Sequence, residues 1–231
     1  MSPLAPLDPI VAALRPFSTC DVADALVKLN HTHGGFLFGP TMWSPERQAG
    51  DTKIIGQAYT VQYVFLDNTD APTVDSHYVD SIPAGAVLFI SSPRTVNAAY
   101  GGLMSTRAKA SGAVGTVVDG IVRDLQEHRE LGFPVFARDL GTTSPYGVMR
   151  VSGINVPVKL QNAEQDVAIN PGDYIIGDVN GVICLPKRLA EKVINLIPSQ
   201  VKADAMIARD IKEGLLFATA SQNHRAGVRR V

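Results

Sequence analysis

The sequence predicts a single α/β domain that has a β-rich second half and a long C-terminal helix. Strand-like apolar segments and helical segments follow one another through the first part of the 231 residues. From Val156 the character changes to short strands and turns, and a helical stretch then runs from Lys187 to about Phe217. The chain is 45% hydrophobic, which is sufficient for a full core, and it shows no internal repeat or linker. We therefore expect one domain over residues 1–231, with a core at 18–200 and a C-terminal helix and tail at 201–231.

The first well-marked helix is predicted to begin after Ser18-Thr19 and to continue through the segment CDVADALVKL. A hydroxyl cap followed by Asp21 and Asp24 is typical of a helix start, because acidic side chains interact favourably with the positive end of the helix dipole. The next segment, His31 to Gly50, is rich in glycine, proline and histidine. It is predicted to be a long loop.

The rest of the first part is predicted to consist of apolar strands and short helices separated by glycine-containing turns. Asp119-Gly120 is predicted to turn the chain after one of these strands, and Gly112 and Gly132 each to end a helix. Strands are predicted at 54–66, 86–91, 114–118 and 134–137, and helices at 73–80, 98–111 and 125–131.

The second part is predicted to contain a strand at 165–169, a turn at 171–173 and then a hairpin. The hairpin strands are Tyr174–Gly177 and Val182–Leu185, and Asn180-Gly181 lies between them. Asn-Gly is a strong hairpin signal, because both residues tolerate the left-handed backbone of a tight turn.

Composition argues against several classes of partner. The net charge of −1 favours neither nucleic acid nor an anionic membrane, and the short basic end from Arg225 to Val231 is interpreted as a solvated tail. No apolar run reaches the ~18 residues that a membrane helix needs. Cys20 and Cys184 are far apart and form no CxxC motif, so we expect free thiols. With no secretory signal at the N-terminus, the expectation is a soluble cytoplasmic protein.

The first candidate site feature is the segment Tyr100-Gly101-Gly102-Leu103-Met104, which lies where a strand-and-loop segment enters a helix. Free N–H groups at a helix start bind anions, and glycine lets a ligand approach the backbone. A carboxylate could therefore bind the amides of Leu103 and Met104. Taken alone, two glycines before a helix are a structural turn in most proteins.

The second feature is the pair Arg123-Asp124, which follows the predicted strand at 114–118. Ligands in open α/β sheets gather at the carboxyl ends of strands. The planar guanidinium of Arg123 suits a substrate carboxylate or a developing enolate oxygen, and Asp124 is a hard oxygen ligand for Mg²⁺ or Mn²⁺. The structural alternative is that Asp124 caps the helix that follows and that Arg123 pairs with a nearby acid.

Three further side chains lie near this pair in the sequence. Glu127 and His128 are three and four positions after Asp124, so all three can share one helix face, and Glu127 could hold a metal ion through water. For His128 we favour an exposed helix position. Asp119 could face the site or satisfy backbone N–H groups in its turn.

With these residues the chain resembles the 4-hydroxy-4-methyl-2-oxoglutarate / 4-carboxy-4-hydroxy-2-oxoadipate aldolase family, also called RraA-like. The resemblance spans about residues 18 to 200 and implies an α/β/β/α swivelling-type domain that assembles as homotrimers or hexamers, with active sites between subunits. It is carried by TCDVADAL at 19–26, by Gly102-x20-Arg123-Asp124-x2-Glu127, by LGFPVF at 131–136 and by PGDYIIGDVNGVICLP at 171–186.

The resemblance implies a class II aldolase that releases pyruvate from 2-oxo acids such as 4-hydroxy-4-methyl-2-oxoglutarate. It implies that Asp124 binds a divalent metal, Mg²⁺ or Mn²⁺, that Arg123 binds the pyruvyl part of the substrate, and that the amides of the Gly-Leu-Met loop hold its carboxylate. The metal and Arg123 would stabilise the pyruvate enolate. Decarboxylation of oxaloacetate passes through the same enolate and is an expected second activity.

Two departures from the family pattern concern the surroundings of the site. Some family aldolases carry an acidic residue in the glycine loop, where this chain has Gly101 and Gly102. A further acid can come from the C-terminal region of a neighbouring subunit, and Asp204, Asp210 and Glu213 are the candidates.

The segment from His31 to Gly50 is a candidate for a branch-specific insertion that covers the site. The preferred substrate, the physiological metal and the oligomer size stay open.

Two functions of different classes fit these features. The first is a metal-dependent lyase with a small 2-oxo acid as its substrate. The second is a non-enzymatic binding protein that regulates a ribonuclease, because some relatives with this fold inhibit an RNA-degrading enzyme and lack the Arg-Asp-x2-acid set. This chain retains that set at Arg123, Asp124 and Glu127, so the lyase is favoured.

Overall fold

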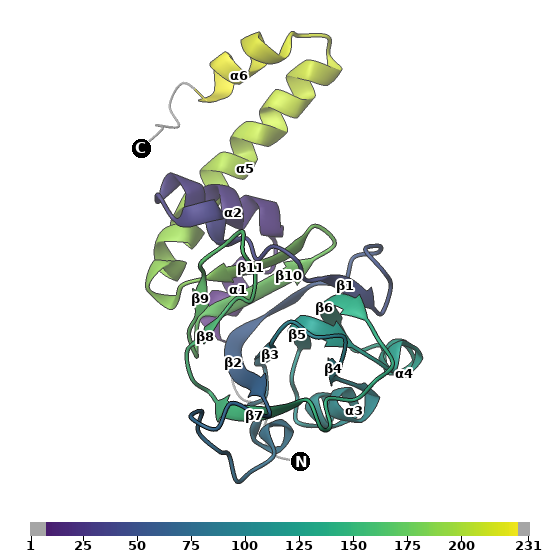
Figure 1. Ribbon diagram of the computed structural model, residues 1–231. Helices are drawn as coiled ribbons and strands as arrows, with labels where there is room; N and C mark the ends of the chain where they lie inside the picture. The colour runs from purple at the N-terminus through teal and green to yellow at the C-terminus, as the bar shows by residue number, and fades with distance from the viewer. Residues whose placement is uncertain (1–7, 226–231) are drawn as a thin grey trace.

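The computed structural model describes residues 8–225, which form a body of strands and short helices with a helical arm projecting from it (Figure 1). The helices are α1 Pro9–Leu14, α2 Thr19–Lys28, α3 Gly102–Ala110, α4 Leu125–Glu130, α5 Ala190–Lys212 and α6 Phe217–Arg225, with 3₁₀ turns η1 Thr32–Gly35, η2 Tyr78–Ser81 and η3 Lys187–Leu189. The strands are β1 Thr41–Ser44, β2 Ile54–Phe65, β3 Val87–Ser91, β4 Ala98–Tyr100, β5 Gly115–Val122, β6 Val135–Leu140, β7 Met149–Ile154, β8 Val158–Lys159, β9 Ala168–Ile169, β10 Tyr174–Asp178 and β11 Gly181–Leu185.

Nine of these strands form one mixed sheet that curls into a nearly closed shape (Figure 1). Its order is β1-β6-β5-β3-β2-β10-β11, with β4 added alongside β5 and β7 alongside β2. The centre, β2-β3-β5-β6, is parallel, whereas β1, β7, β10 and β11 pair antiparallel. A parallel centre must be covered on both faces, and all five residues of β3 are buried accordingly.

Alternate residues of the central strands point into two different apolar clusters, as the two-residue period of a strand requires. Leu88 and Ile90 of β3 join the cluster that packs against α3 and α4, whereas Val87 and Phe89 join the cluster inside the curl of the sheet. A third cluster lies between the β10–β11 hairpin and α1, α2 and the first half of α5. The elements that carry the candidate site are therefore held by the first cluster.

The structure confirms several elements expected from the sequence. Ser18 caps α2 and forms a capping box with Asp21, and Gly112 and Gly132 follow α3 and α4 in left-handed conformations. The hairpin at 174–185 turns at Val179-Asn180, and Gly181 has a φ of 137°. The long helical stretch is also present, but it breaks at Gly214, whose φ is 97°, so α5 and α6 are separate helices.

The prediction of one long loop from His31 to Gly50 is wrong. The segment contains η1 and the edge strand β1, which pairs antiparallel with β6. Met42 and Trp43 are buried in the core, and the Leu37 N–H donates to Val182 O at 2.9 Å. A four-residue strand among prolines and glycines shows too little periodicity to be seen in the sequence, and its pairing with β6 comes from tertiary contacts. The segment is part of the sheet.

The predicted helix at 73–80 is also wrong, because only η2 is helical there. The guanidinium of Arg150 accounts for the difference, since it binds the carbonyls of Asn68, Ala71 and Pro72 at 2.6–2.8 Å and holds the preceding chain as a loop. The predicted strand at 165–169 is reduced to β9, and the strand β7 was not expected.

Two further corrections concern the neighbourhood of the candidate site. Residues 98–100 are the strand β4 rather than the start of the helix. Asp119-Gly120 does not turn the chain, because β5 continues through it to Val122. Gly120 lies where a Cβ atom would be only 3.0 Å from Ser92 Cβ, so the glycine reflects a close approach of two segments.

The second half of α5 leaves the body, and α6 folds back against it to form the arm (Figure 1). Asp210 of α5 is buried against α6, and its carboxylate lies 2.7 Å from His224 Nε2. Asp204 pairs with Arg225 in the same way. The last six residues of the basic end, 226–231, lie outside the described residues.

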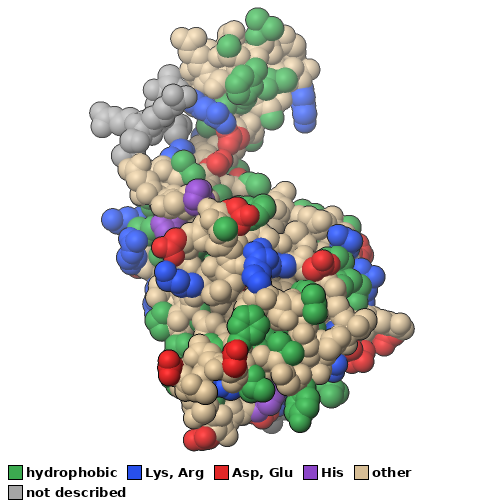
Figure 2. Space-filling view, in the orientation of Figure 1, with side chains coloured by type: hydrophobic (Ala, Val, Ile, Leu, Met, Phe, Trp, Pro, Cys, Tyr) green, Lys and Arg blue, Asp and Glu red, His purple; other side chains and the backbone are tan. Residues whose placement is uncertain are grey.

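The described surface is mixed in charge. Figure 2 shows acidic and basic side chains interspersed over the visible face of the body, consistent with the net charge of −1. Within residues 8–225, no helix combines the length and the apolar character that crossing a membrane would require.

Asp178 links the β10–β11 hairpin to the start of α2. Its buried carboxylate accepts the Thr19 N–H at 2.8 Å, the Thr19 hydroxyl at 2.7 Å and the Asn180 N–H at 2.9 Å. These hydrogen bonds satisfy one of the free N–H groups at the helix start and one in the hairpin turn.

Asp178→Ala should lower the free energy of unfolding by about 3 kcal/mol, because it leaves several donors buried without an acceptor. Urea denaturation measures this change. Asp166→Ala is the control, since that side chain is 85% exposed in its ion pair with Lys159 and its loss should cost about 0.5 kcal/mol or less. Equal losses in the two variants would contradict the role assigned to Asp178.

Candidate functional site

The pairing of β4 with β5 places the glycine loop beside Arg123 and Asp124. The two strands are parallel, with Tyr100 opposite Val122, and the Arg123 N–H donates to Tyr100 O at 3.0 Å. Both strands end at this level, so the next residues of each chain segment emerge together at the carboxyl edge of the sheet. Gly101 and Gly102 follow β4 and start α3, and Asp124 follows β5 and precedes α4.

The carboxylate of Asp124 faces the start of α3. Asp124 has a left-handed backbone, with φ 60° and ψ 41°, and its side chain makes no capping hydrogen bond to α4. Instead, Oδ2 accepts the Gly102 N–H at 3.0 Å and lies 3.4 Å from Arg123 Nε. The structural alternative of a plain cap on the following helix is therefore wrong, whereas the expected convergence of the glycine loop, Arg123 and Asp124 is observed.

Both glycines leave space for the acidic side chains that approach them. A Cβ atom on Gly101 would lie 2.6 Å from Asp124 Oδ2 and 3.2 Å from Arg123 Nε. A Cβ atom on Gly102 would overlap Glu127 Oε2 and lie 2.6 Å from Glu127 Cδ. Two carboxylates therefore flank one Gly-Gly dipeptide, and the absence of a side chain from the loop leaves the space that these carboxylates occupy.

The amides at the start of α3 are only partly available to a ligand. The Gly102 N–H is bound by Asp124, and the Met104 N–H donates to Gly101 O at 3.1 Å. Within residues 8–225, the Leu103 N–H has no recorded acceptor, and its side chain is 75% exposed. Of the two amides expected to bind a substrate carboxylate, the structure leaves Leu103 available and engages Met104 within the helix start.

The site is open in a single chain. The side chains of Arg123 and Asp124 are 39% and 32% exposed, and Glu127 is exposed. The described residues contain no group of three or more His, Cys, Asp or Glu side chains placed to hold a metal ion. Asp124 and Glu127 thus supply two hard oxygen donors and leave the remaining positions to water, substrate or another chain, which suits Mg²⁺ because it usually keeps several waters.

The structure removes His128 and Asp119 from the candidate site. His128 was expected on an exposed helix face, but it is fully buried and its ring stacks on Tyr100 with centroids 5.7 Å apart. Burial lowers the pKa of His128. Asp119 lies inside β5, where it pairs with Arg138 and accepts the Gln161 N–H. Burial raises the pKa of the Asp119 carboxyl, although the contacts with Gln161 and Arg138 lower it.

Tyr100 was part of the predicted glycine-loop segment, but its role in the site was not predicted from the sequence. Its carbonyl accepts the Arg123 N–H, its ring stacks on His128, and its hydroxyl lies 3.0 Å from both Ser105 Oγ and Thr116 Oγ1. It therefore joins β4, α3, α4 and β5. In the sequence, the feature that could have indicated this role is the position of Tyr100 directly before Gly101-Gly102.

The three acids suggested for a neighbouring site all lie on the arm or at its base. Asp204 and Asp210 are engaged within their own chain by Arg225 and His224. Glu213 follows α5 at the far end, with Arg209 3.8 Å away, and its side chain is 63% exposed. Of the three acids, Glu213 therefore has the carboxylate with the weakest contacts within its own chain.

The match to a family model decides the family. The model described as RraA-like, Aldolase/RraA, matches residues 19–184. The chain belongs to this family. The match begins at the first residue of α2 and ends in β11, and it includes every residue of the candidate site.

Two curated relatives illustrate the range of family members. Protein DlpA from Legionella pneumophila is 31% identical over 145 residues, which cover 62% of this chain but only 23% of DlpA. A protein named putative 4-hydroxy-4-methyl-2-oxoglutarate aldolase from Halalkalibacterium halodurans is 30% identical over 169 residues, which cover 73% of this chain and 76% of that protein.

Solved structures agree with the RraA-like fold. An uncharacterized protein from Pseudomonas syringae pv. tomato matches 95% of this chain and 99% of its own, with 25% identity and a TM-score of 0.74. Streptomyces coelicolor RraAS2, described as an unusual member of the RNase ES inhibitor RraA protein family, matches 83% of this chain and 92% of its own, with 25% identity and a TM-score of 0.70.

The role of Asp124 in the fold can be separated from its charge. Asp124→Asn should change the free energy of unfolding by only about 0.5 kcal/mol, because asparagine tolerates the left-handed backbone and its amide oxygen can accept the Gly102 N–H. Asp124→Ala should cost about 2 kcal/mol, because it loses the acceptor and strains the backbone. Urea denaturation of both variants tests this, and a large loss in Asp124→Asn would contradict it.

Proposed function

We propose that this protein is a divalent-metal-dependent lyase that cleaves 4-hydroxy-4-methyl-2-oxoglutarate-type 2-oxo acids to pyruvate and decarboxylates oxaloacetate. The observation that carries the proposal is the convergence of the Asp124 and Glu127 carboxylates, the Arg123 guanidinium and the Leu103 amide around Gly101-Gly102. The aldolase name of the relative from Halalkalibacterium halodurans supports the same reaction class.

The cationic and donor groups account for substrate binding. The start of α3 carries the positive end of a helix dipole, and the free Leu103 N–H can donate to a carboxylate oxygen of the substrate. Arg123 lies beside it and can donate to the 2-oxo group and to the carboxylate through its planar fork. These two groups would fix the 2-oxo acid end of the substrate at the start of α3.

The acidic groups fit a hard divalent metal ion. Asp124 would bind Mg²⁺ or Mn²⁺ directly and Glu127 would do so through water, since both carboxylates face the same loop and both are accessible. When bound, the ion supplies Lewis acidity at the 2-oxo group. Arg123 contributes a second positive charge at the same oxygen, which strengthens the stabilisation of developing negative charge.

The electron flow is the same for both substrates. In the aldol cleavage a water molecule takes the proton of the C4 hydroxyl, the C3–C4 bond breaks and its electrons pass to the 2-oxo oxygen, leaving pyruvate enolate and a second carbonyl product. In oxaloacetate the C3–C4 bond breaks with loss of carbon dioxide to the same enolate. Protonation at C3 then gives pyruvate. Arg123 acts through its positive charge and its N–H donors and transfers no proton.

The active form is proposed to be a homotrimer or hexamer in which a neighbouring subunit completes the site. The incomplete acid set of the described residues and the arm that leaves the body both support this (Figure 1). Glu213 is proposed as the contributed acid, because its side chain is accessible near the end of the arm. A charge supplied across a subunit contact would explain why one chain leaves Asp124 so exposed.

The wild-type protein should form pyruvate from oxaloacetate and from 4-hydroxy-4-methyl-2-oxoglutarate with Mg²⁺, and EDTA should abolish both activities. Asp124→Asn should reduce kcat/KM by at least about 100-fold, since it removes the charge that holds the metal ion. A coupled lactate dehydrogenase assay measures pyruvate. Full activity in folded Asp124→Asn would contradict the proposal.

The competing function makes the opposite prediction. A protein that acts only by binding a ribonuclease, the role that the name of the RraAS2 family suggests for those relatives, should release no pyruvate and bind no metal ion. Absence of both in folded wild-type protein, together with inhibition of a ribonuclease, would replace the lyase by this function.

Mixing two inactive variants tests the shared site. Glu213→Gln should be nearly inactive, and co-refolding it with Asp124→Asn should restore up to about a quarter of the wild-type activity, because random assortment pairs the intact residues in that share of sites. Each variant alone, put through the same procedure, is the control. No recovery in mixed oligomers would contradict the contribution of Glu213.

A further inference from the structure

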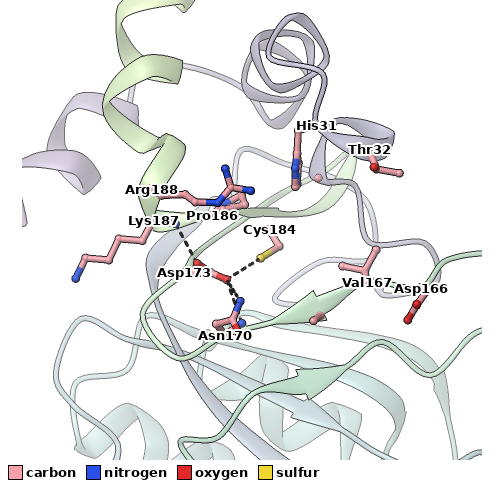
Figure 3. Close-up of a pocket in the computed structure, with 12 residues that line it drawn as sticks. His31, Thr32, Asp166, Val167, Asn170, Asp173, Cys184, Pro186, Lys187 and Arg188 are labelled. Atoms are coloured by element: carbon pink, nitrogen blue, oxygen red, sulfur yellow. Dashed lines mark hydrogen bonds between the residues drawn. The ribbon is translucent and has the colours of Figure 1, made fainter.

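A second cavity lies on a different part of the body from the candidate active site (Figure 3). It has a volume of about 450 Å³, which is in the range of small-molecule sites. Its walls come from η1, from the segment around β9 and from the chain that leads out of β11 into α5. It shares no lining residue with the Gly101–Asp124 region, and no function described above involves it.

The floor of the cavity is fixed by Asp173, whose carboxylate is fully engaged. Oδ1 accepts the Lys187 N–H at 2.9 Å, and Oδ2 accepts the backbone and side-chain N–H groups of Asn170 at 3.0 and 3.1 Å (Figure 3). Asp173 is buried, as is Cys184 beside it. These contacts set the shape of the cavity and leave the Asp173 carboxylate little capacity to bind another cation.

Two cationic or hydrogen-bonding side chains line the cavity without a protein acceptor. Figure 3 shows the side chains of His31, which directly precedes η1, and Arg188, which lies in η3, at this cavity. No hydrogen bond or ion pair of either side chain is recorded within residues 8–225. Burial lowers the pKa of His31, the positive charge of Arg188 lowers it further, and the Asp173 carboxylate acts in the opposite direction.

Within the described residues, neither neighbouring carboxylate forms an ion pair with Arg188. Asp173 is engaged by the donors described above, and Asp166 extends toward solvent and pairs with Lys159 at 2.9 Å. Lys187 is adjacent to Arg188, but its side chain extends away from the labelled residues of the cavity in Figure 3. The guanidinium of Arg188 is thus the fixed positive charge available to a ligand in this space.

Part of the remaining lining is apolar. Val167, Ala168 and Pro186 contribute hydrocarbon surface to the cavity. A bare inorganic ion would leave this surface hydrated, whereas a short aliphatic chain would remove it from water at a gain of roughly 25 cal/mol per Å². The lining therefore fits a ligand with a charged head and a small apolar body.

We propose that this cavity is a second binding site for a small organic acid. The carboxylate binds between the Arg188 guanidinium and the His31 imidazole, and the aliphatic part packs against Val167 and Pro186. Because no active-site residue takes part, occupancy of this cavity does not depend on the lyase reaction.

Calorimetric titration with butyrate tests the proposal, with the Arg123→Gln background used throughout to remove carboxylate binding at the candidate active site. Butyrate should bind this background, and the additional change Arg188→Gln should weaken binding at least tenfold. Arg188 is exposed at the surface, so the variant should keep its thermal unfolding temperature. Lys187→Gln is the matched control, because it removes the same charge one residue away and should change the affinity less than twofold.

Inorganic phosphate and butylamine serve as comparison ligands in the same titration. The proposal expects weaker binding of phosphate, which lacks the apolar body, and no binding of butylamine, which has the wrong charge. Equal loss of butyrate affinity in Arg188→Gln and Lys187→Gln, binding of phosphate as tight as that of butyrate, or no butyrate binding to the folded Arg123→Gln protein would each overturn it.

Discussion

The candidate active site depends on the pairing of a three-residue strand, β4, with the end of β5. The hydrogen bond from the Arg123 N–H to Tyr100 O joins the two segments at the point where both leave the sheet. Asp124 then turns into a left-handed conformation and directs its carboxylate across to the start of α3. Without that pairing, the glycine loop and the Arg-Asp pair would be 20 residues apart in sequence with nothing to hold them together.

Electrostatics and packing both favour this arrangement at the start of α3. The N-terminal end of α3 favours a negative group, and Asp124 supplies one through the Gly102 N–H. Glycine at 101 and 102 leaves room for the Asp124 and Glu127 side chains, whose atoms lie where Cβ atoms would be. An acidic side chain in this loop would compete with these carboxylates for the same space. The glycine loop thus carries no acidic side chain of its own, and the Asp124 and Glu127 carboxylates pack against it instead.

The sequence was sufficient to predict the parts whose signals are local. The capping box joins Ser18 to Asp21, only three positions away, and Gly112, Gly132 and Gly181 have positive φ values that few other residues adopt. It was insufficient for β1 and β4, which are four and three residues long and are strands only because β6 and β5 lie beside them. The burial of His128 follows from its stacking on Tyr100, a contact that requires the tertiary fold.

The site itself was predicted only in outline. The motif located Gly102, Arg123, Asp124 and Glu127, but not the competition for amides that leaves Leu103 available and Met104 engaged. The central claim is that these residues stabilise a pyruvate enolate, and its most direct test is independent of the natural substrate. Exchange of the pyruvate methyl protons with D₂O, followed by ¹H NMR with Mg²⁺, should be catalysed by the wild-type protein and not by Asp124→Asn. Equal exchange rates with the two folded proteins, or no exchange above buffer with either, would contradict the account.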